Sequence, residues 1–235
     1  MTTSTHTHSP DAAERTVAIQ AGGVELDGDL AIPEGARGIV LFAHGSGSSR
    51  HSSSNRFVAE ELRGGGLGTL LFDLFTAHEE QVDLHTRQIR FDIGLLADRL
   101  IEAMAWLDTQ DDTRGLPVGL FGESTGGGAA LVAAARHPDR VNAVVSRGGR
   151  PDLTGEDLPF VRAPTLLIVG GNDSVVIHLN EQAMARMNAP VLLEIIPGAT
   201  HLFEESGALE QVAGLARAWF ARHLQPNRPQ KRSQQ

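Results

Sequence analysis

Short hydrophobic runs recur along the chain and are separated by longer segments with a different spacing. The runs at 39–43 and 69–72 are apolar at almost every position, as in strands that are buried on both faces of a sheet. Residues 24–32 alternate apolar and polar side chains, which predicts a half-exposed strand at the edge of the sheet. Further buried strands are predicted at 118–121, 141–145, 165–169 and 191–196.

The segments between these runs carry apolar residues at the three- and four-residue spacing that is typical of helices. The pattern is clearest near the end of the chain, in Leu209, Val212, Leu215, Trp219 and Phe220. Strands that alternate with helices predict an α/β fold, in which a doubly wound and mostly parallel sheet is flanked by helices on both faces. The predicted helices are 55–63, 89–109, 125–136, 179–187 and 209–224.

The two ends of the chain have a different composition. Residues 1–15 are rich in Thr, Ser and His, and residues 225–235 are rich in Gln, Pro and Arg, so we expect disordered tails around one domain at 16–224. His6 and His8 could hold a metal ion adventitiously, although a mobile tail is the favoured interpretation. At 235 residues, of which 41% are hydrophobic, the chain can form one substantial core.

Charge and cysteine content narrow the classes of function. A net charge of −9 argues against binding to nucleic acid or to an anionic membrane, and favours small molecules as partners. The chain has no cysteine, which excludes disulfides, a thiolate nucleophile and cysteine-bound metal. No signal peptide and no membrane-spanning stretch is recognised, so we expect a soluble, cytoplasmic protein. The sequence leaves the oligomeric state open.

Residues 122–126 spell Gly-Glu-Ser-Thr-Gly, the G-x-S-x-G pattern. A buried strand precedes this pattern and a helix of small residues follows it, as a nucleophile elbow requires. In such a turn the two glycines avoid a collision with neighbouring backbone, and the serine projects above the sheet. We therefore predict that Ser124 is the nucleophile; the alternative is an ordinary glycine-rich loop.

Two further polar residues follow strands later in the chain. Asp173 comes after the strand at 165–169, and His201 comes after the strand at 191–196. The order Ser124, Asp173, His201 is the order in which a sheet of this architecture presents nucleophile, acid and base. We predict that His201 takes the proton of Ser124 and that Asp173 fixes the imidazole tautomer. Taken singly, Asp173 could instead cap a helix and His201 could be an ordinary loop histidine.

Other residues that follow strands suggest supporting roles. Ser46, in the loop after the strand at 39–43, is predicted to give one oxyanion N–H, and Thr125 the other. His44 is expected to brace that loop through its ring nitrogens rather than to act in catalysis. Arg147 and Arg150 follow the strand beside the elbow and could bind a substrate carboxylate or phosphate. They could equally pair locally with Asp152, Glu156 or Asp157.

These motifs together resemble the α/β-hydrolase superfamily, and in particular its dienelactone-hydrolase-like branch. The likeness extends from about residue 24 to residue 224. Dienelactone hydrolases proper use a cysteine nucleophile, whereas this chain has Ser124, so dienelactone itself is in doubt as the substrate. The motifs that carry the resemblance are Gly122-Glu123-Ser124-Thr125-Gly126, Gly171-Asn172-Asp173 and Gly198-Ala199-Thr200-His201-Leu202-Phe203.

The resemblance implies hydrolysis of an ester or lactone through an acyl-enzyme. We expect a serine esterase that acts on a small ester, thioester or lactone without a cofactor or a metal ion. The short link at 146–164 leaves no room for a large lid, and the connection at 74–88 is expected to be a solvated loop rather than a metal site. The alternatives are acyl transfer or perhydrolysis with the same triad, and a binding protein that has lost turnover.

Overall fold

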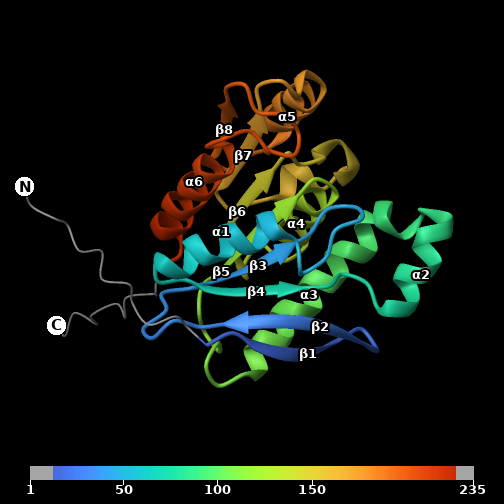
Figure 1. The fold of residues 1–235 in the computed structure, drawn as a ribbon, viewed down its shortest axis with the longest axis vertical. Coiled ribbons are helices and arrows are strands. Elements are labelled where there is room, and N and C mark those ends of the chain that lie inside the picture. The colour runs from blue at the N-terminus through green and yellow to red at the C-terminus, as the bar shows by residue number, and fades with distance from the viewer. Residues whose placement is uncertain (1–12, 226–235) are drawn as a thin grey trace, which may run out of the picture.

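The protein is built around one sheet of eight strands, which the computed structural model describes together with its helices over residues 13–225. Of the predicted tails at 1–15 and 225–235, residues 1–12 and 226–235 lie outside the described residues. The strand order is β1-β2-β4-β3-β5-β6-β7-β8, and all pairs are parallel except β1 with β2 and β2 with β4 (Figure 1). The strands are β1 (Arg15–Ala21), β2 (Val24–Ala31), β3 (Ile39–Ala43), β4 (Gly68–Phe72), β5 (Val118–Glu123), β6 (Val141–Arg147), β7 (Thr165–Gly170) and β8 (Val191–Ile196).

Helices cover both faces of the sheet and divide the core into two layers. On one face α1 (Ser53–Gly64) and α6 (Ala208–His223) pack against residues such as Val40 and Phe42 of β3. On the other face α3 (Ile93–Thr109), α4 (Thr125–Arg136) and α5 (Ser174–Arg186) cover the alternate residues, such as Leu41. Adjacent positions of one strand thus enter opposite layers, which explains the continuous hydrophobic runs. The predicted α/β, doubly wound and mostly parallel fold is confirmed.

Two predictions about the first half of the chain were wrong. The strand at 24–32 is not at the edge, because β1 pairs with it in antiparallel register from Arg15↔Leu30 to Ala21↔Val24. The predicted tail therefore ends earlier than residue 15. The second half of β2, from Gly28 to Ala31, is buried and pairs with β4.

The second error concerns the predicted loop at 74–88, most of which is helix α2 (Ala77–Thr86). The helix begins with a capping box: the Thr76 hydroxyl accepts from the Glu79 N–H at 3.1 Å, and the Glu79 carboxylate accepts from the Thr76 N–H at 2.8 Å. Most of its side chains are exposed, so the helix shows little apolar periodicity in the sequence. It projects from the body of the molecule (Figure 1).

The remaining elements differ from the prediction mainly at their ends. Helix α5 starts at Ser174, five residues before the predicted start, because Asp173 caps it by accepting from the Val176 N–H at 3.4 Å. Between β6 and β7 the described chain contains only the short 3-10 turns η2 (Pro151–Thr154) and η3 (Leu158–Phe160), as expected for a protein without a large lid. No helix within residues 13–225 is both long and apolar enough to cross a membrane.

Candidate active site

Ser124 stands between β5 and α4 in a strained backbone conformation, with φ 51° and ψ −117°. A Cβ atom at Gly122 would lie 2.4 Å from the carbonyl oxygen of Gly126, and one at Gly126 would lie 2.1 Å from that of Ala43. Both positions therefore require glycine, as the elbow pattern predicts. The backbone carbonyl of Ser124 is held by N–H groups of Gly127 and Arg150, each at 3.0 Å. The turn at Ser124 is consequently held both from α4 and from the loop after β6.

His201 and Asp173 meet beyond the ends of β7 and β8. The Nδ1 atom of His201 lies 2.7 Å from Oδ2 of Asp173, and because a carboxylate can only accept, Nδ1 carries the hydrogen. This leaves Nε2 unprotonated in the neutral ring and able to accept a proton. The side chain of His201 is 38% exposed and that of Asp173 is 16% exposed, so the base is open to substrate while its partner is sheltered. Glu205, a carboxylate four residues after His201, accepts the Thr200 N–H at 3.1 Å.

The nucleophile and the histidine both lie against the end of β6. The Ser124 N–H donates to the carbonyl oxygen of Arg147 at 3.1 Å. The next residue, Gly148, has a φ of 54°, and a Cβ there would lie 3.3 Å from Cε1 of the His201 ring. Among the hydrogen bonds of the described residues, none joins His201 to Ser124. Such bonds are often long in enzymes without substrate and shorten when the reacting complex forms.

The loop after β3 lies beside the start of α4. The Ser46 and Thr125 hydroxyls are 3.1 Å apart, so the two residues predicted to supply oxyanion N–H groups are neighbours. His44 braces this loop as predicted: its Nδ1 donates to Gly45 O and its Nε2 accepts from Leu74 N–H, each at 3.0 Å. Burial lowers the pKa of His44, which keeps the ring neutral, as this pair of hydrogen bonds requires.

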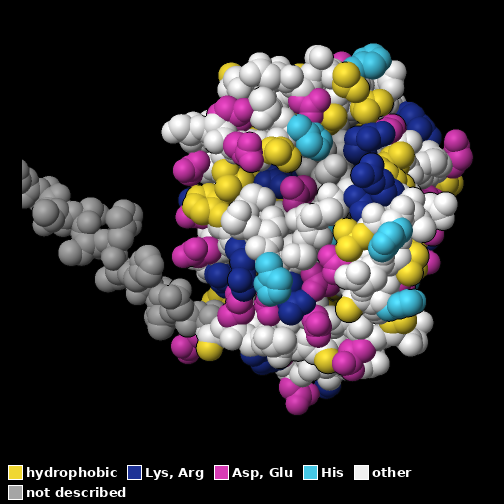
Figure 2. All heavy atoms as spheres, turned by 45° about the vertical axis from the view of Figure 1, so that its right-hand side comes forward, with side chains coloured by type: hydrophobic (Ala, Val, Ile, Leu, Met, Phe, Trp, Pro, Cys, Tyr) yellow, Lys and Arg dark blue, Asp and Glu magenta, His cyan; other side chains and the backbone are white. Residues whose placement is uncertain are grey.

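The two arginines of the prediction are engaged within the protein. Arg147 is 2% exposed and forms an ion pair with Glu123, a partner that the sequence did not suggest. Burial lowers the pKa of Arg147, and the charge of Glu123 opposes that change. Arg150 pairs with Asp152 through two hydrogen bonds of 2.8 and 2.7 Å, which raise the pKa of Arg150 and lower that of Asp152. The local alternative therefore describes Arg150, and Arg147 is not available to a substrate. Figure 2 shows acidic and basic side chains distributed together over the face that it draws.

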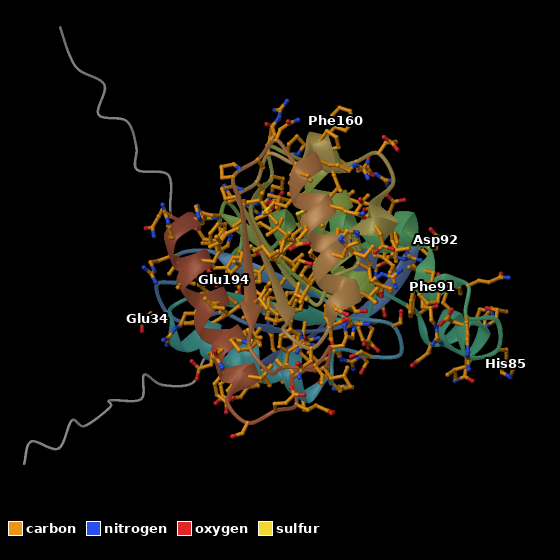
Figure 3. The ribbon with its side chains drawn as sticks, turned by 90° about the horizontal axis from the view of Figure 1, so that it is seen from above. Glu34, His85, Phe91, Asp92, Phe160 and Glu194 are labelled. Atoms are coloured by element: carbon orange, nitrogen blue, oxygen red, sulfur yellow. The ribbon has the colours of Figure 1, made fainter. Side chains whose placement is uncertain are left out.

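A different arginine approaches the oxyanion loop. Arg90, in the 3-10 turn η1 (Ile89–Phe91), is held by the buried carboxylate of Asp83 through Nε at 2.6 Å. Its Nη1 atom would lie 4.0 Å from a Cβ at Gly47, next to Ser46. Burial would raise the pKa of Asp83, but the hydrogen bonds and charge of Arg90 outweigh it and lower that pKa. We call residues 77–91, which contain α2 and η1, the α2–η1 arm. Figure 3 shows the neighbouring Phe91 on this arm. The sequence gives no periodic signal for this arm; its only marker was the Thr76–Glu79 capping pair.

A cavity of about 510 Å³ lies beside the elbow and the histidine loop. Its walls come from the start of α1 (Ser53, Phe57), from Glu123, and from Leu202 and Leu209 on either side of the loop that leads to α6. Glu123 and Leu202 are the sequence neighbours of Ser124 and His201, whereas Ser124 and His201 themselves do not line this cavity. Within residues 13–225 there is no group of three or more His, Asp or Glu side chains that could hold a metal ion.

The sheet, the elbow and the Asp173–His201 pair define an α/β-hydrolase. The chain belongs to the dienelactone hydrolase family, whose family model matches residues 26–223. It is 60% identical to the dienelactone hydrolase from Anabaena variabilis, whose crystal structure superposes with a TM-score of 0.90 and covers 92% of this chain and 100% of that chain. Est1E from Butyrivibrio proteoclasticus shares the fold at 16% identity, with a TM-score of 0.74 over 88% of this chain and 98% of that one.

A curated relative extends well beyond the matched region. The Mycobacterium tuberculosis protein named "Putative phosphoribosyl transferase" is 59% identical over 215 residues, which are 92% of this chain and 48% of that protein. The chain thus spans about half the length of this relative.

Proposed function

We propose that the protein is a serine hydrolase that cleaves a small carboxylic ester, thioester or lactone through an acyl-enzyme on Ser124. The observation that carries this proposal is the strained elbow serine at the same end of the sheet as the His201–Asp173 hydrogen bond of 2.7 Å. A serine hydroxyl alone is a weak nucleophile, so a base within reach is needed for attack on a carbonyl carbon. Membership of a hydrolase family supports the same conclusion.

In acylation the Ser124 oxygen attacks the carbonyl carbon while Nε2 of His201 takes the hydroxyl proton. The imidazolium that forms is stabilised by Asp173 at Nδ1. The negative charge that develops on the carbonyl oxygen is received by the backbone N–H groups of Ser46 and Thr125. His201 then gives its proton to the leaving alcohol, thiol or ring oxygen, and the acyl group remains on Ser124.

Deacylation uses the same residues with water as the nucleophile. Nε2 of His201 takes a proton from the water as its oxygen attacks the acyl carbon, and then returns a proton to the Ser124 oxygen as the ester bond breaks. The reaction balances without an oxidant, a metal ion or an organic cofactor.

Covalent labelling tests this function directly. A fluorophosphonate probe should attach to the intact protein, and peptide mapping should find it on Ser124. The Ser124→Ala variant should not be labelled, and the His201→Ala variant should be labelled far more slowly. Labelling elsewhere, or none in the parent protein, would contradict the proposal and favour a binding protein that has lost turnover.

Substrate identity is decided by a panel rather than by relatives. The Anabaena relative is named a dienelactone hydrolase, so dienelactone belongs in the panel together with acetyl, butyryl, octanoyl and succinyl esters. Adding an alcohol or hydrogen peroxide as competing acceptor distinguishes hydrolysis from acyl transfer and perhydrolysis. Phosphoribosyl transfer is not proposed, because the chain corresponds to only 48% of the relative that bears that name.

A further inference from the structure

A buried ion pair lies directly beneath the elbow. Glu123, the residue before Ser124, and Arg147 are the last residues of β5 and β6 and face each other in the sheet register. Arg147 is 2% exposed and Glu123 is 16% exposed. Asn55 of α1, which is also buried, donates from Nδ2 to the second carboxylate oxygen of Glu123 at 3.0 Å. The carboxylate is therefore held from the neighbouring strand and from the helix above it.

The same arginine reaches the loop that carries the histidine. Its guanidinium carbon lies 5.7 Å from the centre of the Phe203 ring, in the geometry of a cation–π contact. Phe203 is 2% exposed and has a φ of 56°, which is unusual for a residue with a bulky side chain. It follows His201 by two residues. The buried ring thus fixes the backbone of the histidine loop in a conformation that an unconstrained chain would leave.

Ion pairs of this kind are weak evidence for a role in stability. Removing two charges from water costs free energy that their attraction does not always recover, and buried pairs can often be replaced by apolar residues without loss of stability. Here the cost is increased because Nη1 of Arg147 and Oδ1 of Asn55 are buried without a hydrogen-bond partner. What the pair does provide is fixed geometry, because Arg147 holds one carboxylate oxygen of Glu123 while Asn55 holds the other.

We propose that Glu123, Arg147 and Phe203 form a brace that holds His201 in register with Ser124. The brace connects the residue before the nucleophile to the residue two positions after the base, through the strand end against which both lie. These three are positioning residues: they act on the reaction through Ser124 and His201 and need not touch the substrate. The inference rests on the proposed function, since it assigns the base to His201.

Pre-steady-state hydrolysis of p-nitrophenyl acetate tests the brace. The burst amplitude counts active sites, the burst rate measures acylation, and the steady-state rate measures deacylation. Because His201 transfers protons in both steps, a displaced imidazole should slow both by similar factors. A misplacement of about 1 Å can cost about a hundredfold in rate, so we expect a loss of about tenfold to a hundredfold, with KM changed by less than about twofold.

The main variant is the double substitution Glu123→Gln with Arg147→Met, which removes both charges and keeps an amide for Asn55. Its folding is checked by the melting temperature and by the burst amplitude. Arg147→Lys, which keeps the positive charge beside Glu123 but not the planar guanidinium, should recover part of the rate. Arg140→Met is the matched control: Arg140 pairs with Asp108 at 2.7 Å on the surface, and its loss should change neither rate.

The outcomes separate the brace from the proposed function. If the parent protein shows neither a burst nor labelling of Ser124, the serine-hydrolase proposal fails. If the parent shows a burst and the folded double variant has the same burst and steady-state rates, the hydrolase stands and the brace is overturned. A folded double variant with full burst amplitude and both rates lowered together supports the brace. A change confined to KM would assign these residues to substrate binding and would also overturn it.

Discussion

The elbow and the α2–η1 arm both border the loop after β3, but different interactions fix their conformations. At the elbow, backbone atoms approach where Gly122 and Gly126 leave no side chain, and nearly everything around them is buried. The arm is fixed by charges: Glu79 both caps α2 and pairs with Arg99 at 2.8 Å, and Asp83 holds Arg90. Steric constraints set the backbone conformation of the elbow, whereas ion pairs hold the arm in place.

The difference predicts how each region responds to change. A single carbon added at Gly122 or Gly126 meets closely packed backbone, so even this smallest substitution should lower the free energy of unfolding strongly. Leu84 and Phe91 of the arm are 58% and 52% exposed, and α2 buries little apolar surface. Substitutions in the arm should therefore alter the preference among substrates more than the stability of the fold. Figure 3 shows His85 and Phe91 on this arm, apart from the body of the molecule.

The largest effect should come from removing the nucleophile. Ser124→Ala should lower kcat/KM by about 10⁴-fold or more, because the covalent route is lost, while the free energy of unfolding should stay the same or rise as the strained turn relaxes. His201→Ala should be almost as damaging, and the double variant hardly worse. Kinetics on a short acyl ester, with thermal melts, measure both quantities. Losses that multiply in the double variant would show that the two residues do not act as a unit.

The next effect separates glycines by their surroundings. Gly122→Ala should destabilise the protein by about 3 kcal/mol or more, because its Cβ would lie 2.4 Å from a backbone oxygen in a packed core. Gly214→Ala in α6 is the control: no atom lies within 4 Å of its Cβ position. Alanine there should stabilise the helix by about 0.5 to 1 kcal/mol. Denaturant unfolding of both variants provides the comparison, and equal changes would mean that the elbow can relax.

The contrast also explains which features the sequence could predict. Ser124 and its two glycines form a local pattern whose steric reason can be read from five residues, and Asp173 and His201 follow strands that are strongly hydrophobic. The partner of Arg147 could not be predicted, because Glu123 and Arg147 become neighbours only through the register of β5 and β6. Nothing in the sequence between them marks that register.

The arm was missed for a related reason. Hydrophobic periodicity finds elements that bury one face, and α2 buries little beyond Asp83. Strand β1 was missed because its pattern is short and lies beside a polar tail, and its pairing depends on the turn at Gly22 and Gly23, which have φ of 58° and 90°. In the sequence, α2 is marked only by its capping residues and β1 only by the two glycines after it, and each of these signals is weak when read alone.

A smaller effect should appear when the charge of the arm is changed. Arg90→Met should lower the preference for a succinyl over a butyryl ester by about tenfold, because its Nη1 atom lies toward Gly47 and a hydrogen bond to a charged group contributes about 1.5 to 3 kcal/mol. The change should fall mainly on KM. Arg150→Met, whose parent side chain is engaged by Asp152, should keep the parent ratio. Steady-state kinetics on the two esters decide, and an unchanged ratio in Arg90→Met would remove that arginine from substrate recognition.

The smallest effect concerns the dependence of stability on pH at His44, which supports the loop between the two regions. Burial lowers its pKa in the folded state, so below the ordinary histidine pKa of about 6.5 the unfolded chain binds a proton that the folded protein does not. Stability contributed by this group is therefore complete above that pH and is lost as the pH falls, with a slope of at most about 1.4 kcal/mol per pH unit.

Glutamine at position 44 can make the same two hydrogen bonds without titrating, since its amide nitrogen can donate to Gly45 O and its oxygen can accept from Leu74 N–H. His44→Gln should thus cost little at pH 8 and should flatten the decline in the free energy of unfolding between pH 7 and pH 5. Urea unfolding at several pH values measures both curves. His78→Gln, the same substitution at an exposed position of α2, is measured beside it as the control for the chemical change itself. Parallel curves for the parent and His44→Gln would show that the buried ring takes up a proton as readily as a free one. The assignment of a neutral His44 ring in this loop would then be wrong.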